Sequence, residues 1–214
     1  MSKRIAMLGG SFDPVHNGHL SLAENVQIEL GYDKILFFPT SISPFKQDAT
    51  PLANSERLTL LNYAVECNSH FAVDDFELRQ QGVSYTIETI RYCYEQYHID
   101  GKLGLIIGHD LLAHFYQWHE AETILQLVDL IVGQRPEKMV VKNGRKRVNS
   151  KSTSDARASN RIPPYIQLQN EALQISSTYI RTAIEQGKAW RYLVPEKVYN
   201  YIVEKRYYKH ETKN

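Results

Sequence analysis

Cysteine is scarce in this sequence, with two residues among 214, and that scarcity argues against a disulfide framework. Cys67 and Cys93 lie far apart and form no CxxC pair, which also argues against a thiolate metal site. This usage is typical of a reducing compartment, so we expect a cytoplasmic protein.

An excess of one charge sign and long apolar runs are also missing. The chain carries 25 Lys and Arg against 24 Asp and Glu, a net charge of +1, so no overall field indicates nucleic acid or membrane as a partner. No apolar stretch reaches the length of a membrane span, and the one near Met1 is too short for a secretory signal. Hydrophobic residues make up 43% of the chain, enough for a sizeable core. We expect a soluble globular protein.

Apolar runs alternate with amphipathic segments along the chain. We expect strands over 4–10, 34–39, 70–75, 102–108, 129–133 and 165–169. We expect helices over 18–30, 54–67, 84–97, 176–188 and 195–209, and one or two helices over 110–127. Strands that are apolar throughout and alternate with helices predict a doubly wound parallel α/β sheet, in which ligands bind beyond the carboxyl ends of the strands.

The domain organisation follows from where this alternation stops. We expect one domain over residues 1–192 and a C-terminal helical part over 193–214 that packs on it. The segment of about 135–161 is rich in Lys, Arg, Asn and Ser, which predicts a basic surface loop or a partly disordered insertion, and we assign it no catalytic role.

The first candidate site is the stretch GGSFDPVHNGHL, which begins at Gly9. Glycines after a strand let a phosphate approach the backbone, and the next helix offers free N–H groups. The pattern is neither GxGxxG nor a Walker motif. His16 and His19 could bind metal, act as acid and base, or donate to a phosphate, and surface capping is the plain alternative. A metal would need a third ligand, and only Asp13 is near in sequence.

The second candidate site is the stretch ISSTYIR, which begins at Ile175. Ser176 and Ser177 lie at a predicted helix start and Arg181 lies one turn later, so hydroxyls, N–H groups and a guanidinium could converge on an anion. An ordinary helix cap with a surface arginine is the alternative. Because both candidates lie at strand-to-helix junctions, a parallel sheet would bring them to one edge, around one triphosphate.

With these two motifs, the stretches SPFK, SYTIETI, IIGHDLL, QWHEAETIL, IVGQRP and YLVPEKVYNYI occur in order along the chain. Together they resemble the HxGH nucleotidyltransferases and, within them, the family of bacterial nicotinate-nucleotide adenylyltransferases. The resemblance covers nearly the whole chain. It departs at Phe45, where a His is common in the family, and at His109, where a small residue is usual.

The resemblance implies a Rossmann-like nucleotidyltransferase that transfers an adenylyl group from ATP to nicotinate mononucleotide. The products would be deamido-NAD and pyrophosphate, and Mg²⁺ would be the cofactor. The reaction would be a step of NAD biosynthesis. The acceptor phosphate is itself a competent nucleophile, so we assign no general base and expect catalysis by positioning and electrostatics. The oligomeric state stays open, with a homodimer as one option.

The residues expected to act fall into three groups. The candidate catalytic residues, all donors to phosphate, are His16, His19, Lys46 and Arg181. The candidate ATP-binding residues are Gly9, Gly10, Ser11, Phe12, Gly108, Asp110, Ser176, Ser177 and Thr178. The family pattern gives, as candidate residues for the mononucleotide, Tyr85, Thr86, Trp118 and His119.

Two other functions compete with this one. Phosphopantetheine adenylyltransferases share the first motif, but they are usually shorter and lack the elements that contain Thr86 and Trp118. A nucleic-acid-binding protein could use the basic residues Arg145, Lys146, Arg147 and Lys151. The near-neutral net charge and the lack of interleaved aromatic residues argue against that function.

Overall fold

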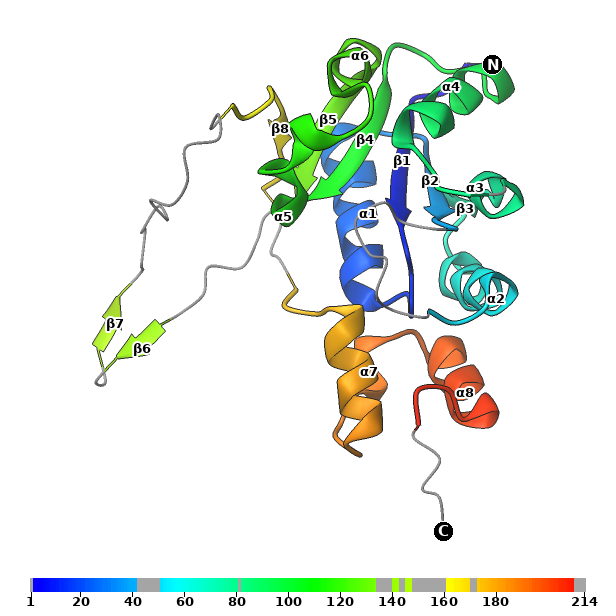
Figure 1. Ribbon diagram of the computed structural model, residues 1–214, viewed down its shortest axis with the longest axis vertical. Coiled ribbons are helices and arrows are strands. Elements are labelled where there is room, and N and C mark those ends of the chain that lie inside the picture. The colour runs from blue at the N-terminus through cyan, green and yellow to red at the C-terminus, as the bar shows by residue number, and fades with distance from the viewer. Residues whose placement is uncertain are drawn as a thin grey trace.

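Six parallel strands form one sheet in the order β3-β2-β1-β4-β5-β8 (Figure 1). The computed structural model describes residues 2–41, 51–80, 82–133, 140–142, 145–147, 161–169 and 173–209. The strands of the sheet are β1 (Ile5–Gly10), β2 (Lys34–Pro39), β3 (Phe71–Val73), β4 (Leu103–Gly108), β5 (Val128–Gly133) and β8 (Ile166–Gln167). Strand order reverses between β1 and β4, which is where ligands bind in open sheets of this kind.

Helices cover both faces of the sheet. They are α1 (Asn17–Leu30), α2 (Asn54–Val65), α3 (Phe76–Arg79), α4 (Thr86–Gln96), α5 (His109–Leu112), α6 (Ala121–Leu127), α7 (Ser177–Glu185) and α8 (Glu196–Lys205). Two short 3₁₀ turns, η1 (Phe115–Gln117) and η2 (Arg191–Leu193), complete the described helical elements. None of the helices in the described ranges is long and apolar enough to cross a bilayer.

The strands are apolar on both sides because successive side chains enter two different cores. In β1, Ala6 and Leu8 pack with α1, α2, α7 and α8, whereas Ile5 and Met7 pack with α4, α5 and α6. The same alternation recurs along β2, β4 and β5. The predicted doubly wound α/β fold is therefore confirmed.

The C-terminal helices close one end of the molecule. Figure 1 shows α7 and α8 beyond the ends of β1 and β2, next to each other. Helix α8 packs against α2, with Val198 and Ile202 in the core and the Tyr201 hydroxyl donating to Glu56 at 2.9 Å. The side chain of Asn17 donates to the Tyr192 carbonyl at 2.9 Å. The turn η2, which precedes α8, thus contacts the first motif.

Three elements differ from the sequence-based expectation. The segment 110–127 divides into α5, η1 and α6, because Trp118 is extended and Glu120 adopts a left-handed conformation with φ of 53°. Helix α3 was missed, since one turn is too short to show helical periodicity. The basic insertion expected as a surface loop or partly disordered segment contains, in its described part, two short strands, β6 (Val140–Lys142) and β7 (Arg145–Arg147), which pair antiparallel.

Candidate active site

A cavity of about 420 Å³ opens at the reversal of strand order, beyond the carboxyl ends of β1 and β4. This volume is in the range of small-ligand sites. The backbone of β1 and the residues after it form one wall, and the start of α4 and the turn before α6 form another. Predicted site residues that line the cavity are Gly9, Gly10, Ser11, Tyr85, Thr86, Gly108, Trp118 and His119. The cavity thus joins the predicted acceptor residues to part of the predicted ATP-binding residues. The described candidates that do not line it are Phe12, His16, His19, Asp110, Ser176, Ser177, Thr178 and Arg181.

His16 and His19 lie together at the start of α1. Their rings stack, with centroids 3.7 Å apart. The His16 backbone N–H donates to Nδ1 of His19 at 3.3 Å, so a neutral His19 carries its proton on Nε2. His19 can therefore donate one hydrogen bond from Nε2, as an oxyanion requires.

Burial determines the charge of His16. The residue is 5% exposed, and desolvation lowers the pKa of its imidazole from the ordinary 6.5 to about 4. At neutral pH His16 is a neutral ring with one N–H, so it can contribute a dipole rather than a full positive charge.

The residues around the two histidines fix their position. Phe12 is buried and packs edge-on against the His19 ring, with centroids 5.0 Å apart. A side chain at Gly18 would place its Cβ 3.0 Å from Nδ1 of His16, so glycine leaves room for the imidazole. The same Cβ would lie 3.6 Å from Ile175, where the second motif begins.

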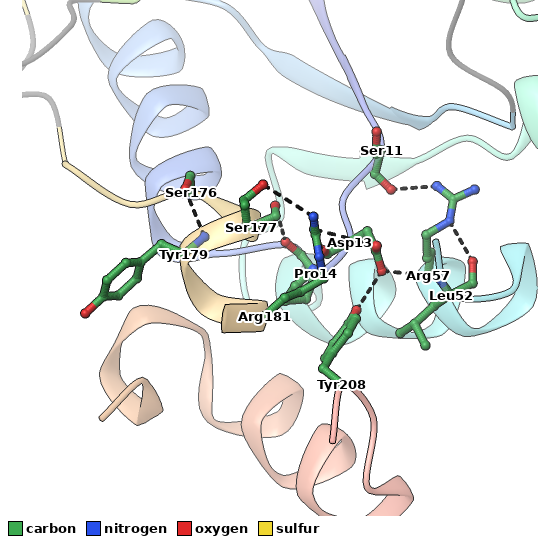
Figure 2. Close-up of polar contacts among 11 residues, drawn as sticks. Ser11, Asp13, Pro14, Leu52, Arg57, Ser176, Ser177, Tyr179, Arg181 and Tyr208 are labelled. Atoms are coloured by element: carbon green, nitrogen blue, oxygen red, sulfur yellow. Dashed lines mark hydrogen bonds and ion pairs between the residues drawn. The ribbon is translucent and has the colours of Figure 1, made fainter. Parts of the chain in front are cut away.

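The second motif contacts the first directly, as Figure 2 shows. The Ser177 hydroxyl donates to the Pro14 carbonyl at 2.9 Å. Arg181 donates to the Asp13 carbonyl at 2.6 Å and forms an ion pair with the Asp13 carboxylate at 3.7 Å. The two motifs therefore share one edge of the sheet, although 163 residues separate Pro14 from Ser177.

These contacts give several motif residues a structural role. Ser176 caps α7, since its hydroxyl accepts from the Tyr179 backbone N–H at 3.1 Å. The hydroxyl of Thr178 accepts from Arg181 at 3.3 Å. Part of the Arg181 side chain remains accessible, with 31% of it exposed. Ser177 and Arg181 thus hold the first motif in place, and the exposed part of Arg181 is available to an anion.

Asp13 is the centre of a buried polar cluster that also reaches the C-terminal segment (Figure 2). Its carboxylate accepts from the Tyr208 hydroxyl at 2.7 Å and from the Leu52 backbone N–H at 3.3 Å. Burial and the neighbouring Asp13 raise the pKa of Tyr208, so the phenol stays protonated as a donor. Asp13 is thus fully engaged in organising the loop rather than presented as a metal ligand.

On the opposite wall, aromatic rings surround the space next to Thr86. The rings of Tyr85 and His119 lie 4.8 Å apart, and the half-buried Trp118 packs against Phe115 with centroids 5.2 Å apart. Thr86 is the first residue of α4, so free N–H groups of the helix start are close to it. This wall combines a flat aromatic surface with hydrogen-bond donors.

Glu77 also lines the cavity, although no sequence pattern predicts it as a site residue. Its buried carboxylate accepts from the Thr89 hydroxyl at 2.8 Å. Burial raises the pKa of Glu77, and the hydrogen bond from Thr89 opposes that rise. The sequence gives no signal for it, because Glu77 is one acid among the charged and polar residues of the stretch DDFELRQQ, which begins at Asp74.

The remaining predicted residues have different surroundings. Asp110 is exposed, and its Oδ1 lies 2.6 Å from where a Cβ on Gly108 would be, so a side chain at Gly108 would collide with it. His109 is also exposed. Lys46 and Phe45 fall outside the described residues.

The described residues contain no group of three His, Cys, Asp or Glu side chains that could hold a metal ion. A cation such as Mg²⁺ commonly keeps several waters and binds through substrate phosphates, with few protein ligands. Such an ion fits this site as one carried by a triphosphate, not as one held in a protein cage.

A cavity lined by glycines and aromatic rings, at the strand-order reversal of a doubly wound sheet, is the arrangement expected of a nucleotidyltransferase. The cytidylyltransferase-like family matches residues 7–183, and the chain belongs to that family. A probable nicotinate-nucleotide adenylyltransferase of Treponema pallidum is 40% identical over 209 residues, which span 96% of this chain and 99% of the relative. A probable nicotinate-nucleotide adenylyltransferase of Enterococcus faecalis is 34% identical, over 99% of this chain and 88% of its own length.

Solved structures agree on the fold. The Plasmodium falciparum nicotinic acid mononucleotide adenylyltransferase complexed with NaAD superimposes with a TM-score of 0.70 at 17% identity, over 96% of this chain and 97% of that one. The putative enzyme of Vibrio parahaemolyticus gives a TM-score of 0.64 at 19% identity, over 96% and 95% of the two chains. The resemblance seen in the sequence is therefore confirmed at the level of the family and fold.

Proposed function

We propose that this chain transfers the adenylyl group of ATP to nicotinate mononucleotide. The observation that carries the proposal is the single cavity with the glycines of β1 on one wall and Tyr85, Thr86 and Trp118 on the other. The full-length relatives named nicotinate-nucleotide adenylyltransferase support this choice of acceptor.

The reaction is a direct displacement at the α-phosphorus of ATP. An oxygen of the acceptor phosphate forms the new bond to phosphorus, the bond to the bridging α–β oxygen breaks, and pyrophosphate leaves with that electron pair. Deamido-NAD and pyrophosphate are the products. The chain supplies position and charge rather than a base, because the acceptor phosphate is already anionic near neutral pH.

We assign the triphosphate to the wall that begins at Gly9. In this assignment the Nε2–H of His19 donates to the oxygens on which charge develops, and His16 donates as a neutral ring. Arg181 and Lys46 neutralise phosphate charge, and the start of α7 offers backbone N–H groups. A Mg²⁺ ion bound to the phosphates would add further neutralisation of the leaving group.

We propose that Trp118 stacks on the pyridine ring of the acceptor. The carboxylate of that ring then lies near the N–H groups around Thr86 and His119. A carboxylate only accepts hydrogen bonds, so a subsite of donors suits it, whereas the amide of the nicotinamide form would bring an NH₂ group against donors.

We also propose that residues 1–192 and 193–214 act as one catalytic unit in the cytoplasm. Free Cys67 and buried Cys93 are compatible with a reducing compartment.

The test is product identification by mass spectrometry after incubating the protein with ATP, nicotinate mononucleotide and Mg²⁺. We expect deamido-NAD and pyrophosphate in equal amounts. Turnover of ATP to ADP and phosphate, or no product at all, would refute the proposed reaction.

A further inference from the structure

Arg57 is a charged residue in the core of the protein. It belongs to α2, its exposed fraction is 0%, and it is the first of the largest fully buried side chains. A buried charge is costly unless polar partners satisfy it. None of the salt bridges among the described residues involves Arg57. An apolar residue would fill the same space at lower cost, so packing alone does not explain this arginine.

The partners of the guanidinium are mostly backbone carbonyls of separate loops, some drawn in Figure 2. Nη1 donates to the Ser11 carbonyl at 2.6 Å, and Nη2 donates to the Thr40 carbonyl at 2.8 Å. Nε donates to the Leu52 carbonyl at 3.2 Å, and Nη2 also donates to Oδ1 of Asn54 at 2.6 Å. One planar group therefore holds the chain after β1, the chain after β2 and the start of α2.

Two of these held residues belong to the candidate active site. Ser11 and Thr40 both line the cavity, and the Thr40 backbone N–H donates to the Gly10 carbonyl at 2.9 Å. Their carbonyls accept from the two terminal nitrogens of one rigid guanidinium. A lysine could not replace the guanidinium, because the three donors of an ammonium group radiate from a single atom on a flexible stem.

We propose that Arg57 is a positioning residue for adenylyl transfer, which sets the spacing between the loops that follow β1 and β2 and thereby shapes the triphosphate wall of the cavity. The inference rests on the proposed function for its substrates. Arg57 lies beneath the loops and acts through the Ser11 and Thr40 backbones. Loss of Arg57 should therefore weaken the binding of ATP far more than the binding of the acceptor, whose assigned residues lie on the opposite wall.

The test compares Arg57→Lys with Leu60→Ala, a matched control. Leu60 is a buried apolar residue of the same helix that does not line the cavity, so its truncation destabilises α2 without removing a hydrogen bond to the loops. We expect Arg57→Lys to raise the KM for ATP and the Kd of a non-hydrolysable ATP analogue about tenfold or more, and to lower kcat by about 10²-fold. The acceptor KM should stay within about twofold, as should both KM values of Leu60→Ala.

A readout on the wild-type protein covers the case in which Arg57→Lys does not fold. A buried, hydrogen-bonded guanidinium should give a slowly exchanging Nε–H signal in nitrogen-15 NMR, and this signal should shift on adding the ATP analogue but not on adding nicotinate mononucleotide. The inference is overturned if Arg57→Lys matches Leu60→Ala, if both KM values rise equally, or if the wild-type signal does not respond to the analogue. Because analogue binding and the NMR signal need no turnover, a wild type that binds ATP without making deamido-NAD would refute the proposed function alone.

Discussion

The imidazole rings of His16 and His19 stack with centroids 3.7 Å apart and planes 19° from parallel. His16 is the N-cap of α1 and His19 lies in its first turn, and Phe12 packs edge-on against the His19 ring. Both histidines are thereby fixed before any ligand arrives. Preorganised donors of this kind act without reorganisation cost when charge develops in the transition state.

His19→Ala should lower kcat by about 10²–10³-fold, because it removes one donor to developing charge. The acceptor KM should change little, since the assigned acceptor residues lie on the other wall. Steady-state kinetics with both substrates measures the two effects separately. The control is His70→Ala, which removes an exposed histidine just before β3 and should leave kcat unchanged. A His19→Ala enzyme within a few-fold of wild type would remove His19 from the mechanism.

His16 should titrate with a midpoint of about 4 in the free protein, which NMR of its ring protons can follow. The sign of the stability effect follows from the lowered pKa. Between about 4 and 6.5 the unfolded chain binds more protons than the native one, so native stability rises with pH across that window. The lowering of the His16 pKa from 6.5 to about 4 corresponds to a change of roughly 3 kcal/mol in the free energy of unfolding across that window.

His16→Gln should therefore lose this part of the pH dependence. Denaturant titrations of both proteins at pH 4.5 and pH 7 would show the wild type gaining more stability with rising pH than the variant. An identical pH dependence in the two proteins, or a His16 midpoint near 6.5, would mean that the ring is solvated and charged more readily than its burial indicates.

Glu77→Gln tests the buried carboxyl of the cavity. Because burial raises the pKa of Glu77, the native protein binds the extra proton above the ordinary value of 4.5, and native stability falls as pH rises through that window. Glutamine carries no charge and removes this loss. The stability of Glu77→Gln relative to wild type should therefore increase from pH 4.5 to pH 8 in denaturant titrations. A relative stability that is flat or decreases with pH would show that the native carboxyl ionises normally.

The sequence predicts the sheet well because its strands are apolar throughout and regularly spaced. It also predicts which motifs meet, since both lie at strand-to-helix junctions of a parallel sheet. The contacts of Ser177 with Pro14 and of Arg181 with Asp13 show that meeting. The sequence does not predict that these side chains bind the first motif itself, because the choice between a ligand and a backbone carbonyl depends on distances that no local pattern encodes.

Glu77 and Arg57 escaped the sequence analysis for different reasons. Glu77 lies in a single helical turn that shows no periodicity. Arg57 had a signal, since it lies three and four residues before the buried Leu60 and Leu61, on the apolar face of α2. A charged residue on a predicted apolar face is a departure that can mark a functional position.

Trp118→Ala should weaken the binding of both pyridine mononucleotides, because it removes the flat surface on which the pyridine ring is proposed to stack. It should preserve much of the ratio between them, since donors near Thr86 and not the indole discriminate carboxylate from amide. Acceptor KM values for the nicotinate and nicotinamide forms measure both effects. Tyr192→Ala, which truncates an aromatic residue that is 85% exposed, serves as the control. An unchanged acceptor KM in Trp118→Ala would leave the indole with a packing role alone.

The most direct test of the whole account is pyrophosphate release from ATP, followed in parallel with nicotinate mononucleotide, nicotinamide mononucleotide and phosphopantetheine as acceptors. Donors that face an amide NH₂ leave mismatched buried polar groups, which cost about 1–3 kcal/mol each. We therefore predict that kcat/KM for the nicotinate form exceeds that for the nicotinamide form by roughly 10²-fold or more, with no release above background for phosphopantetheine. Equal use of the two pyridine nucleotides would contradict the carboxylate subsite, and release with phosphopantetheine alone would contradict the proposed function.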